Sequence, residues 1–218
     1  MNRRPRLLAT AAAGATAALI LTACGGGGDK PKANDKIAGA DTGSPTSAAP
    51  GPSATQSAVR PKIELPSDLT YTFEWPKTGD KDKDAVLNDS EQSIKAVDMA
   101  IVNQDALDKA YLFYYEGEAA AETQKFIAAY VKAKARTTGA YRYYDAAVDV
   151  KDSGSASLVY CEDQGKAYDM YLKPKRVDKT AVTKNSYVLY NTQLHKNEKG
   201  VWVIEKLLSQ RGNAKCQP

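Results

Sequence analysis

The chain divides by composition into a part that cannot form a hydrophobic core and a part that can. Residues 25–61 contain 26 Gly, Pro, Ser, Thr or Ala among 37 positions and no aromatic residue. Such a segment has too little apolar surface to offset the entropy lost on folding. All 13 Tyr, both Trp and all three Phe lie after residue 61, so we expect a single folded domain over residues 62–218.

The first 23 residues have the layout of an export signal. Three arginines precede an uncharged, alanine-rich stretch over residues 7–22. This stretch is short for a membrane-spanning helix, which needs about 20 mostly apolar residues. We therefore predict that residues 1–23 are a signal peptide that is removed. The export route stays open, because Arg3 and Arg4 match a twin-arginine signal only loosely.

The signal ends in Leu21, Thr22, Ala23 and Cys24, and this tetrapeptide resembles the lipobox of bacterial lipoproteins. In that family a diacylglycerol is joined to the cysteine sulfur, and the signal is cut just before the cysteine. The resemblance implies an acylated Cys24 at the new N-terminus, held at the outer face of the cytoplasmic membrane, because two acyl chains give stable anchoring. The alternative is a plain secretory signal cut near residues 11–15, which leaves an ordinary thiol.

Residues 24–61 are then the lipidated N-terminus and a disordered, flexible linker. A flexible coil of this length spans roughly 30–36 Å, which is enough to clear the lipid head groups. We therefore expect a tether that holds the folded domain off the membrane.

Removal of the signal makes the chain almost neutral. The full chain has 30 Lys and Arg against 26 Asp and Glu, and three of the arginines lie in the signal, which leaves 27 against 26, or +1. No cluster of basic residues interleaved with aromatic residues remains. The mature chain therefore gives no electrostatic support for nucleic-acid binding.

Two cysteines remain once Cys24 is acylated, namely Cys161 and Cys216. An even pair in an exported protein indicates a disulfide. Closing a loop of about 55 residues stabilises a fold by roughly 4 kcal/mol in the chain-entropy model. Two free thiols are the alternative.

Hydrophobic periodicity divides the folded part into helices followed by strands. Helical spacing of apolar residues covers residues 84–104 and 116–135, and a short helix is expected between them at 106–115. Alternation with period two predicts strands over residues 71–75, 144–150, 156–162, 166–173, 186–195 and 201–210. Turns are expected at residues 152–154 and 163–165. Helices gathered before a run of antiparallel strands indicate an α+β domain.

The order of two helices and then long antiparallel strands resembles the nuclear transport factor 2-like cone fold, in which a curved sheet wraps the helices around a pocket. The segments SYVLYNTQL and GVWVIEKLLSQRG, with the cysteine pair and the lipobox, are also similar to uncharacterised secreted lipoproteins of high-GC Gram-positive bacteria. The resemblance implies N-terminal helices packed on a curved antiparallel sheet. Because the cone fold hosts isomerases, dehydratases and binding domains, it fixes no activity.

An acidic stretch at the start of the first helix is a candidate calcium site. Asp80, Asp82 and Asp84 fall at ligand positions of an EF-hand loop that would end at Glu91. Ala85 stands where such a loop needs glycine, and no helix is expected before it. We therefore favour a helix start capped by a carboxylate, without calcium.

Residues for acid–base chemistry are few. His195 is the only histidine, and we expect it at the exposed end of a strand. A cone-fold enzyme would instead use an interior group such as Asp98, Asp145 or Asp169, whose orientation the sequence does not reveal. We find no nucleophile–base pair and no metal-ligand spacing, so we expect neither a catalytic site nor a metal or other cofactor.

In a cone, six apolar or aromatic side chains are expected to border a pocket: Phe126, Ile127, Tyr130, Tyr144, Tyr160 and Tyr190. Tyrosines offer a large apolar body with one polar tip, which suits a flat, mostly apolar molecule. Simple filling of the core is the alternative for each tyrosine. We predict a non-catalytic binding or accessory module at the cell surface, with a small apolar ligand or a cell-envelope protein as partner. The alternative is a small lyase or isomerase acting on an apolar molecule.

Overall fold

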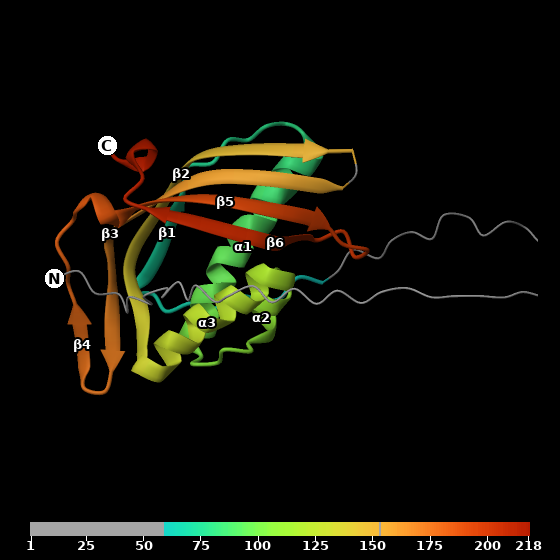
Figure 1. The fold of residues 1–218 in the computed structure, drawn as a ribbon. Coiled ribbons are helices and arrows are strands. Elements are labelled where there is room, and N and C mark those ends of the chain that lie inside the picture. The colour runs from blue at the N-terminus through green and yellow to red at the C-terminus, as the bar shows by residue number, and fades with distance from the viewer. Residues whose placement is uncertain (1–58, 153) are drawn as a thin grey trace, which may run out of the picture. The chain divides into compact units, whose positions relative to one another are not determined.

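The computed structural model describes residues 59–152 and 154–218 (Figure 1). The predicted signal, Cys24 and nearly all of the predicted tether lie outside these residues. The described part is an α+β fold whose elements follow one another as β1 (Leu69–Phe73), α1 (Lys81–Val102), α2 (Lys109–Leu112), α3 (Gly117–Ala133), β2 (Ala135–Lys151), β3 (Ser155–Leu172), β4 (Lys175–Asp178), η1 (Lys184–Ser186), β5 (Tyr187–Lys196), β6 (Trp202–Arg211) and η2 (Ala214–Cys216).

The two long predicted helices are present. Helix α1 begins after Asp80, whose carboxylate accepts the amides of Asp82 and Lys83, as expected for a capped acidic start. Helix α3 ends at Lys134, which adopts a left-handed backbone conformation. The predicted short helix at 106–115 shrinks to the single turn of α2. None of the described helices combines the length and the apolar character that crossing a bilayer requires.

The sheet is curved and mixed, and α1 to α3 lie together on one of its faces (Figure 1). Its strands follow the order β1, β2, β3, β5, β6, with β4 paired to one end of β3. The expectation of a wholly antiparallel sheet was wrong, because β1 runs parallel to β2. The three helices form the long crossover that a parallel pair requires. Within the described residues no ladder joins β1 to β6, so the sheet is not closed.

Strand β3 runs without interruption through the turn predicted at residues 163–165, and this prediction was wrong. Ala140 pairs with Lys166 while Arg142 pairs with Asp163, so β3 carries one extra residue there. The Asp163 carboxylate accepts the amide of Gly165 at 2.7 Å. These polar and glycine residues therefore form a β-bulge that bends the strand instead of ending it.

Strand β2 bends near the same place. Gly139 has a φ of 96°, and a Cβ at this position would collide with the carbonyl oxygen of Lys166 on β3. Only glycine tolerates both conditions. The first half of β2 was missed in the sequence, because its buried side chains include Thr137 and Thr138, which give no apolar alternation.

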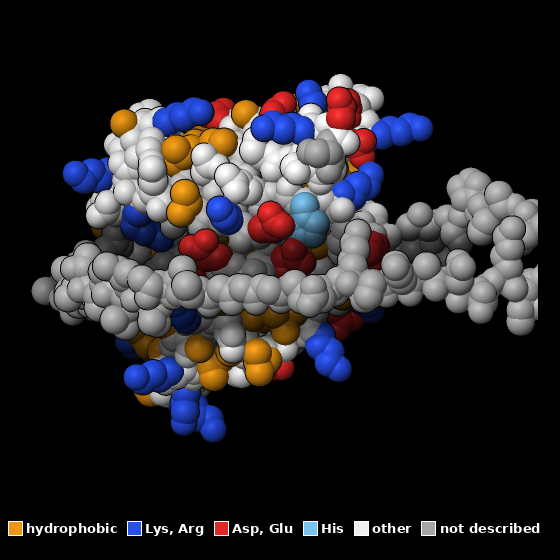
Figure 2. All heavy atoms as spheres, turned by 45° about the vertical axis from the view of Figure 1, so that its right-hand side comes forward, with side chains coloured by type: hydrophobic (Ala, Val, Ile, Leu, Met, Phe, Trp, Pro, Cys, Tyr) orange, Lys and Arg blue, Asp and Glu red, His pale blue; other side chains and the backbone are white. Residues whose placement is uncertain are grey.

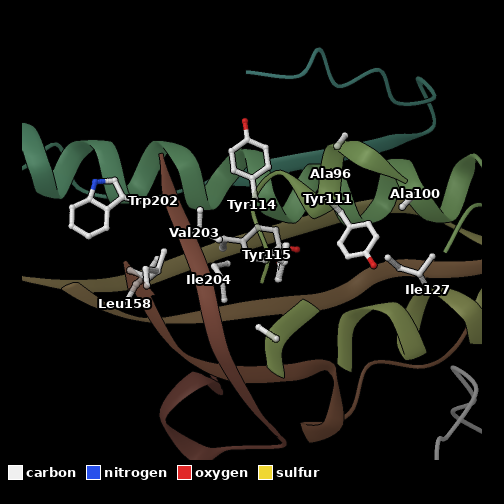
Figure 3. Close-up of a cluster of buried hydrophobic side chains, with 14 of the residues drawn as sticks. Ala96, Ala100, Tyr111, Tyr114, Tyr115, Ile127, Leu158, Trp202, Val203 and Ile204 are labelled. Carbon is white, nitrogen blue, oxygen red and sulfur yellow. The ribbon is translucent and has the colours of Figure 1, made fainter. Parts of the chain in front are cut away.

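The core lies between the helices and the sheet. Figure 3 shows Tyr111, Tyr114 and Trp202 among its fully buried side chains, together with aliphatic residues of α1, α3 and β6. The aromatic residues that composition assigned to the folded part therefore form much of its interior. Burying each of them contributes on the order of 2–3 kcal/mol relative to leaving it in water.

The predicted disulfide between Cys161 and Cys216 is confirmed. The two Cα atoms lie 5.4 Å apart, and the bridge joins the middle of β3 to η2 near the C-terminus. The last turn of the chain is thereby attached to the sheet. By the chain-entropy estimate, a loop of 55 residues makes this cross-link worth roughly 4 kcal/mol.

Candidate functional site

Asp98, on α1, is one of four carboxylates buried in the described part of the fold, the others being Glu162, Asp169 and Asp89. The hydroxyl of Tyr71 on β1 donates to its Oδ2 at 2.7 Å, and the hydroxyl of Thr137 on β2 donates to its Oδ1 at 2.6 Å. Asp98 therefore links α1 to two adjacent strands through both of its oxygens. These hydrogen bonds offset part of the free energy that the carboxylate loses when it leaves water.

Glu162, on β3, is the second, and only 4% of its surface is exposed. Tyr143 donates to Oε1 at 3.0 Å, and Tyr190 donates to Oε2 at 3.0 Å. The amide nitrogen of Gln164 also donates to Oε2, and Arg211 in turn donates to the Gln164 carbonyl at 3.0 Å. The carboxylate therefore holds together neighbouring residues of β2, β3 and β5.

Asp169, also on β3, is the third. It accepts a hydrogen bond of 2.9 Å from the hydroxyl of Tyr130 on α3. Both side chains are buried, so this bond joins the helix layer to the sheet. Among the interior acids proposed from the sequence, Asp98 and Asp169 are thus placed inside the fold, whereas Asp145 lies at a bulge of β2 with a φ of 50°.

The tyrosine hydroxyls of this interior remain protonated over a wide pH range. Burial raises the pKa of Tyr71, Tyr143 and Tyr160 well above the usual value, and the carboxylates Asp98 and Glu162 raise it further. A hydroxyl that keeps its proton acts as a hydrogen-bond donor. The interior therefore consists of carboxylates that accept and phenols that donate.

The six side chains predicted to border a pocket fall into three groups. Tyr160 and Tyr190 stack with ring centroids 5.0 Å apart. Ile127 and Tyr130 are buried on α3, and Phe126 contacts Tyr130 edge to face but is 39% exposed. Tyr144 lies elsewhere: its hydroxyl donates to the carbonyl of Cys216, and the Arg142 guanidinium covers its ring. A shared pocket stays a prediction.

The acidic stretch at Asp80 is occupied by contacts within the protein. Asp84 accepts the amide and the hydroxyl of Thr78 at 2.9 and 2.7 Å, and Asp82 lies 2.8 Å from the ammonium of Lys196. Hydrogen bonds from Thr78 hold the pKa of Asp84 below its usual value. The segment after Asp80 is helical, whereas an EF-hand would need a loop here.

A second group of ionisable side chains lies near the surface, around His195 at the end of β5. Its Nε2 is 3.2 Å from an oxygen of Glu116, the residue before α3, and its Nδ1 is 3.0 Å from an oxygen of Glu205 on β6. Figure 2 shows the histidine in pale blue beside acidic side chains in red. One ligand atom from each of the three lies within 4.8 Å of the others. The sequence predicted His195 at the exposed end of a strand; it lies at that end, but its side chain is only 28% exposed because two carboxylates pack against it.

Two backbone features bring this cluster together. Gln193 pairs with Lys206 and Leu194 with Ile204, so Glu205 is an extra, bulged residue of β6. Beside it, Tyr115 forms a parallel bridge to Ile204, which places Glu116 against β6. The sequence predicted both strands, over residues 186–195 and 201–210, and their antiparallel pairing in the structure brings Glu205 close to His195. Nothing in the sequence indicated the bridge that brings Glu116.

Comparison with known proteins identifies no family for this chain. No protein-family model and no curated protein matches it. Several solved structures, including the following two, are distantly similar. One is the intermembrane-space region of chloroplast protein ARC6, with 12% identity, a TM-score of 0.40, and coverage of 61% of this chain and 98% of the other. The second is a ketosteroid isomerase-like protein from Erwinia carotovora atroseptica, with 10% identity, a TM-score of 0.41, and coverage of 61% and 97%.

Proposed function

We propose that this protein is a lipid-anchored extracytoplasmic protein whose domain has a cone-like fold of the nuclear transport factor 2 type and acts as a non-catalytic binding or accessory module. Cys24 carries the diacylglycerol at the outer face of the cytoplasmic membrane, and the linker up to residue 61 holds the domain away from the lipid. Its partner is a small, flat, apolar molecule or a protein of the cell envelope.

The observation that carries the non-catalytic role is the state of the interior carboxylates. A general base must reach the proton of a substrate within hydrogen-bond distance. Both oxygens of Asp98 and both oxygens of Glu162 already accept hydrogen bonds from the protein, and the two side chains are buried. These acids serve to hold helix and strands together.

The sequence also leaves open a small lyase or isomerase of the cone fold. Such an enzyme would use one of the same carboxylates. The two functions therefore predict different effects when a carboxylate is replaced by an amide of the same shape. In a binding module, Glu162→Gln, Asp98→Asn and Asp169→Asn act through stability. In an enzyme they abolish function even when the folded protein is abundant.

A strain that lacks the gene provides the test, with any growth or envelope defect of that strain as the readout. The three amide variants should restore the parental behaviour in proportion to their abundance in the membrane fraction. Cys24→Ala should leave the membrane fraction and fail to restore it. An amide variant that reaches the parental level and still fails, beside a soluble Cys24→Ala chain that succeeds, would show that the protein is a soluble enzyme.

A further inference from the structure

The cluster of Glu116, His195 and Glu205 brings two negatively charged carboxylates against one imidazole. Two carboxylate oxygens lie 3.2 and 3.0 Å from the two ring nitrogens of a single imidazole. A neutral imidazole donates from one nitrogen and carries a lone pair on the other. One carboxylate therefore faces a lone pair at contact distance, unless positive charge enters the cluster as a second ring proton or as a cation.

The Nδ1 atom makes the conflict specific. It is buried, and although Glu205 approaches it at 3.0 Å, the nitrogen has no hydrogen bond. The nearest lysine along the strand, Lys196, has its ammonium 2.8 Å from Asp82. The ring nitrogen and the two carboxylates each carry lone pairs. A metal cation could bind these lone pairs.

The dimensions of the cluster fit a single small cation. In a tetrahedral zinc site with bonds of about 2.0–2.2 Å, neighbouring ligand atoms lie about 3.4 Å apart. An imidazole binds an ion through one nitrogen, so only one of the two contacts, 3.2 Å at Nε2 or 3.0 Å at Nδ1, is a distance between ligands of the same ion. That contact is close to this value, and the oxygen of the other carboxylate belongs to a set whose atoms all lie within 4.8 Å of one another. The side chains of Glu116 and Glu205 are about half exposed, so rotating them to close the set requires no change in the core.

The ligand types indicate which cation fits. Imidazole nitrogen binds zinc and other late first-row metals, whereas magnesium and calcium prefer oxygen ligands alone. Three protein ligands leave one position of a tetrahedral ion for water. The ligands come from three separate elements, and the bulge and the bridge of β6 hold two of their backbones in place.

We propose that one nitrogen of His195 and one carboxylate oxygen each of Glu116 and Glu205 bind a divalent transition-metal ion of the zinc class. This site lies apart from the interior carboxylates and does not rest on the proposed binding function. The bound ion neutralises the two carboxylates and joins the start of α3 to the β5–β6 hairpin.

The test is a calorimetric titration of the purified chain with Zn²⁺ at neutral pH. The chain carries Cys24→Ala, because a free thiol at that position binds zinc by itself. We expect saturable binding of one Zn²⁺ per chain, no competition from millimolar Mg²⁺, and a concentration-dependent rise in the unfolding temperature. His195→Ala should abolish the binding. Glu116→Gln and Glu205→Gln should each weaken it by at least about 10-fold, the smallest loss expected even from a residue that only supports a ligand.

Glu118→Gln is the matched control, because Glu118 is an exposed acid in the first turn of the same helix. It should bind Zn²⁺ with the parental affinity. All variants alter partly exposed side chains, and circular dichroism verifies that each is folded. The absence of saturable zinc binding in the parent would overturn the proposal. Zinc binding that persists unchanged in His195→Ala would overturn it as well.

Discussion

The acidic residues of this protein behave differently in the interior and at the β5–β6 hairpin. Inside, Asp98 and Glu162 accept hydrogen bonds from hydroxyls on neighbouring elements, and their partners are neutral groups that stay protonated. At the hairpin, Glu116 and Glu205 are half exposed and face the two nitrogens of one imidazole. Acidic side chains therefore connect helices and strands where they are buried, and they remain available to an added cation where they are exposed.

Burial explains this difference. A carboxylate out of water must find its donors within the protein or lose several kcal/mol, so interior acids persist only with complete partners. An exposed carboxylate keeps water as a partner, and its contacts with other charges contribute little to stability. Carboxylates without a full set of partners in the protein are therefore tolerated at the surface, where they remain able to bind a ligand.

The largest effect should come from alkali, which acts on the interior and spares the surface cluster. Burial raises the pKa of Tyr114 and Tyr115 to about 12, and it raises the pKa of Tyr71, Tyr143 and Tyr160 further. The unfolded chain ionises these groups near pH 10, so the stability that they provide is complete below pH 10 and declines as the pH rises towards the folded pKa. Between these two pKa values, each such tyrosine lowers the free energy of unfolding by about 1.4 kcal/mol per pH unit.

We therefore expect cooperative unfolding between about pH 10 and 12. Phenolate absorbance at 295 nm and the far-ultraviolet dichroism should change together. Phenolates that appear while the helices remain intact would show that the tyrosines are not protected by the fold.

The second effect tests a buried acid whose partner is charged. Asp89 of α1 is fully buried, accepts two hydrogen bonds from the Arg60 guanidinium at 2.6 and 2.9 Å, and accepts the amide of Trp202. Arg60→Ala leaves this carboxylate without its cation and should cost about 3 kcal/mol in a urea titration. Lys62→Ala removes only an exposed pair with Glu64 and should change stability by less than about 0.5 kcal/mol. Equal losses in the two variants would contradict the distinction by burial.

A matched pair of glutamates compares the two regions directly. Glu162→Gln replaces an acceptor of three hydrogen bonds with a group that can satisfy them only in part, and should lower the free energy of unfolding by about 2 kcal/mol. Glu205→Gln acts on a half-exposed side chain and should stay within about 0.5 kcal/mol when no metal is present. Urea unfolding in a chelating buffer measures both, and a larger loss for Glu205→Gln would reverse the comparison.

The smallest effect concerns the acids at the start of α1. Asp80→Ala removes the carboxylate that caps the amides of Asp82 and Lys83 and should cost about 1 kcal/mol. Asp82→Ala breaks an exposed contact with Lys196 and should cost less than about 0.5 kcal/mol. Thermal unfolding of the two variants gives the order, and a larger loss for Asp82→Ala would show that the surface contact outweighs the cap.

Periodicity and composition determined the part of the protein that rests on local signals. The position of the folded domain, the helices α1 and α3, the hairpin between residues 144 and 162 and the cysteine pair all follow from short-range patterns or from compartment. The lipid anchor at Cys24 and the linker stay predictions from the sequence, because nearly all of residues 24–61 lie outside the described residues. The helices and the hairpin depend on residues close together in the chain, where spacing has a direct physical meaning. The two cysteines lie 55 positions apart, and their pairing was inferred from the even count and the predicted export.

Tertiary structure alone decided what the polar residues do. Asp163 and Gly165 have the composition of a turn, yet β3 continues through them because β2 bends beside it at Gly139. Tyr130 reaches Asp169 across 39 positions, and Glu116 reaches His195 only because residue 115 forms a bridge to β6. Local pattern carries no information about such contacts, since they depend on the curvature and register of the assembled sheet.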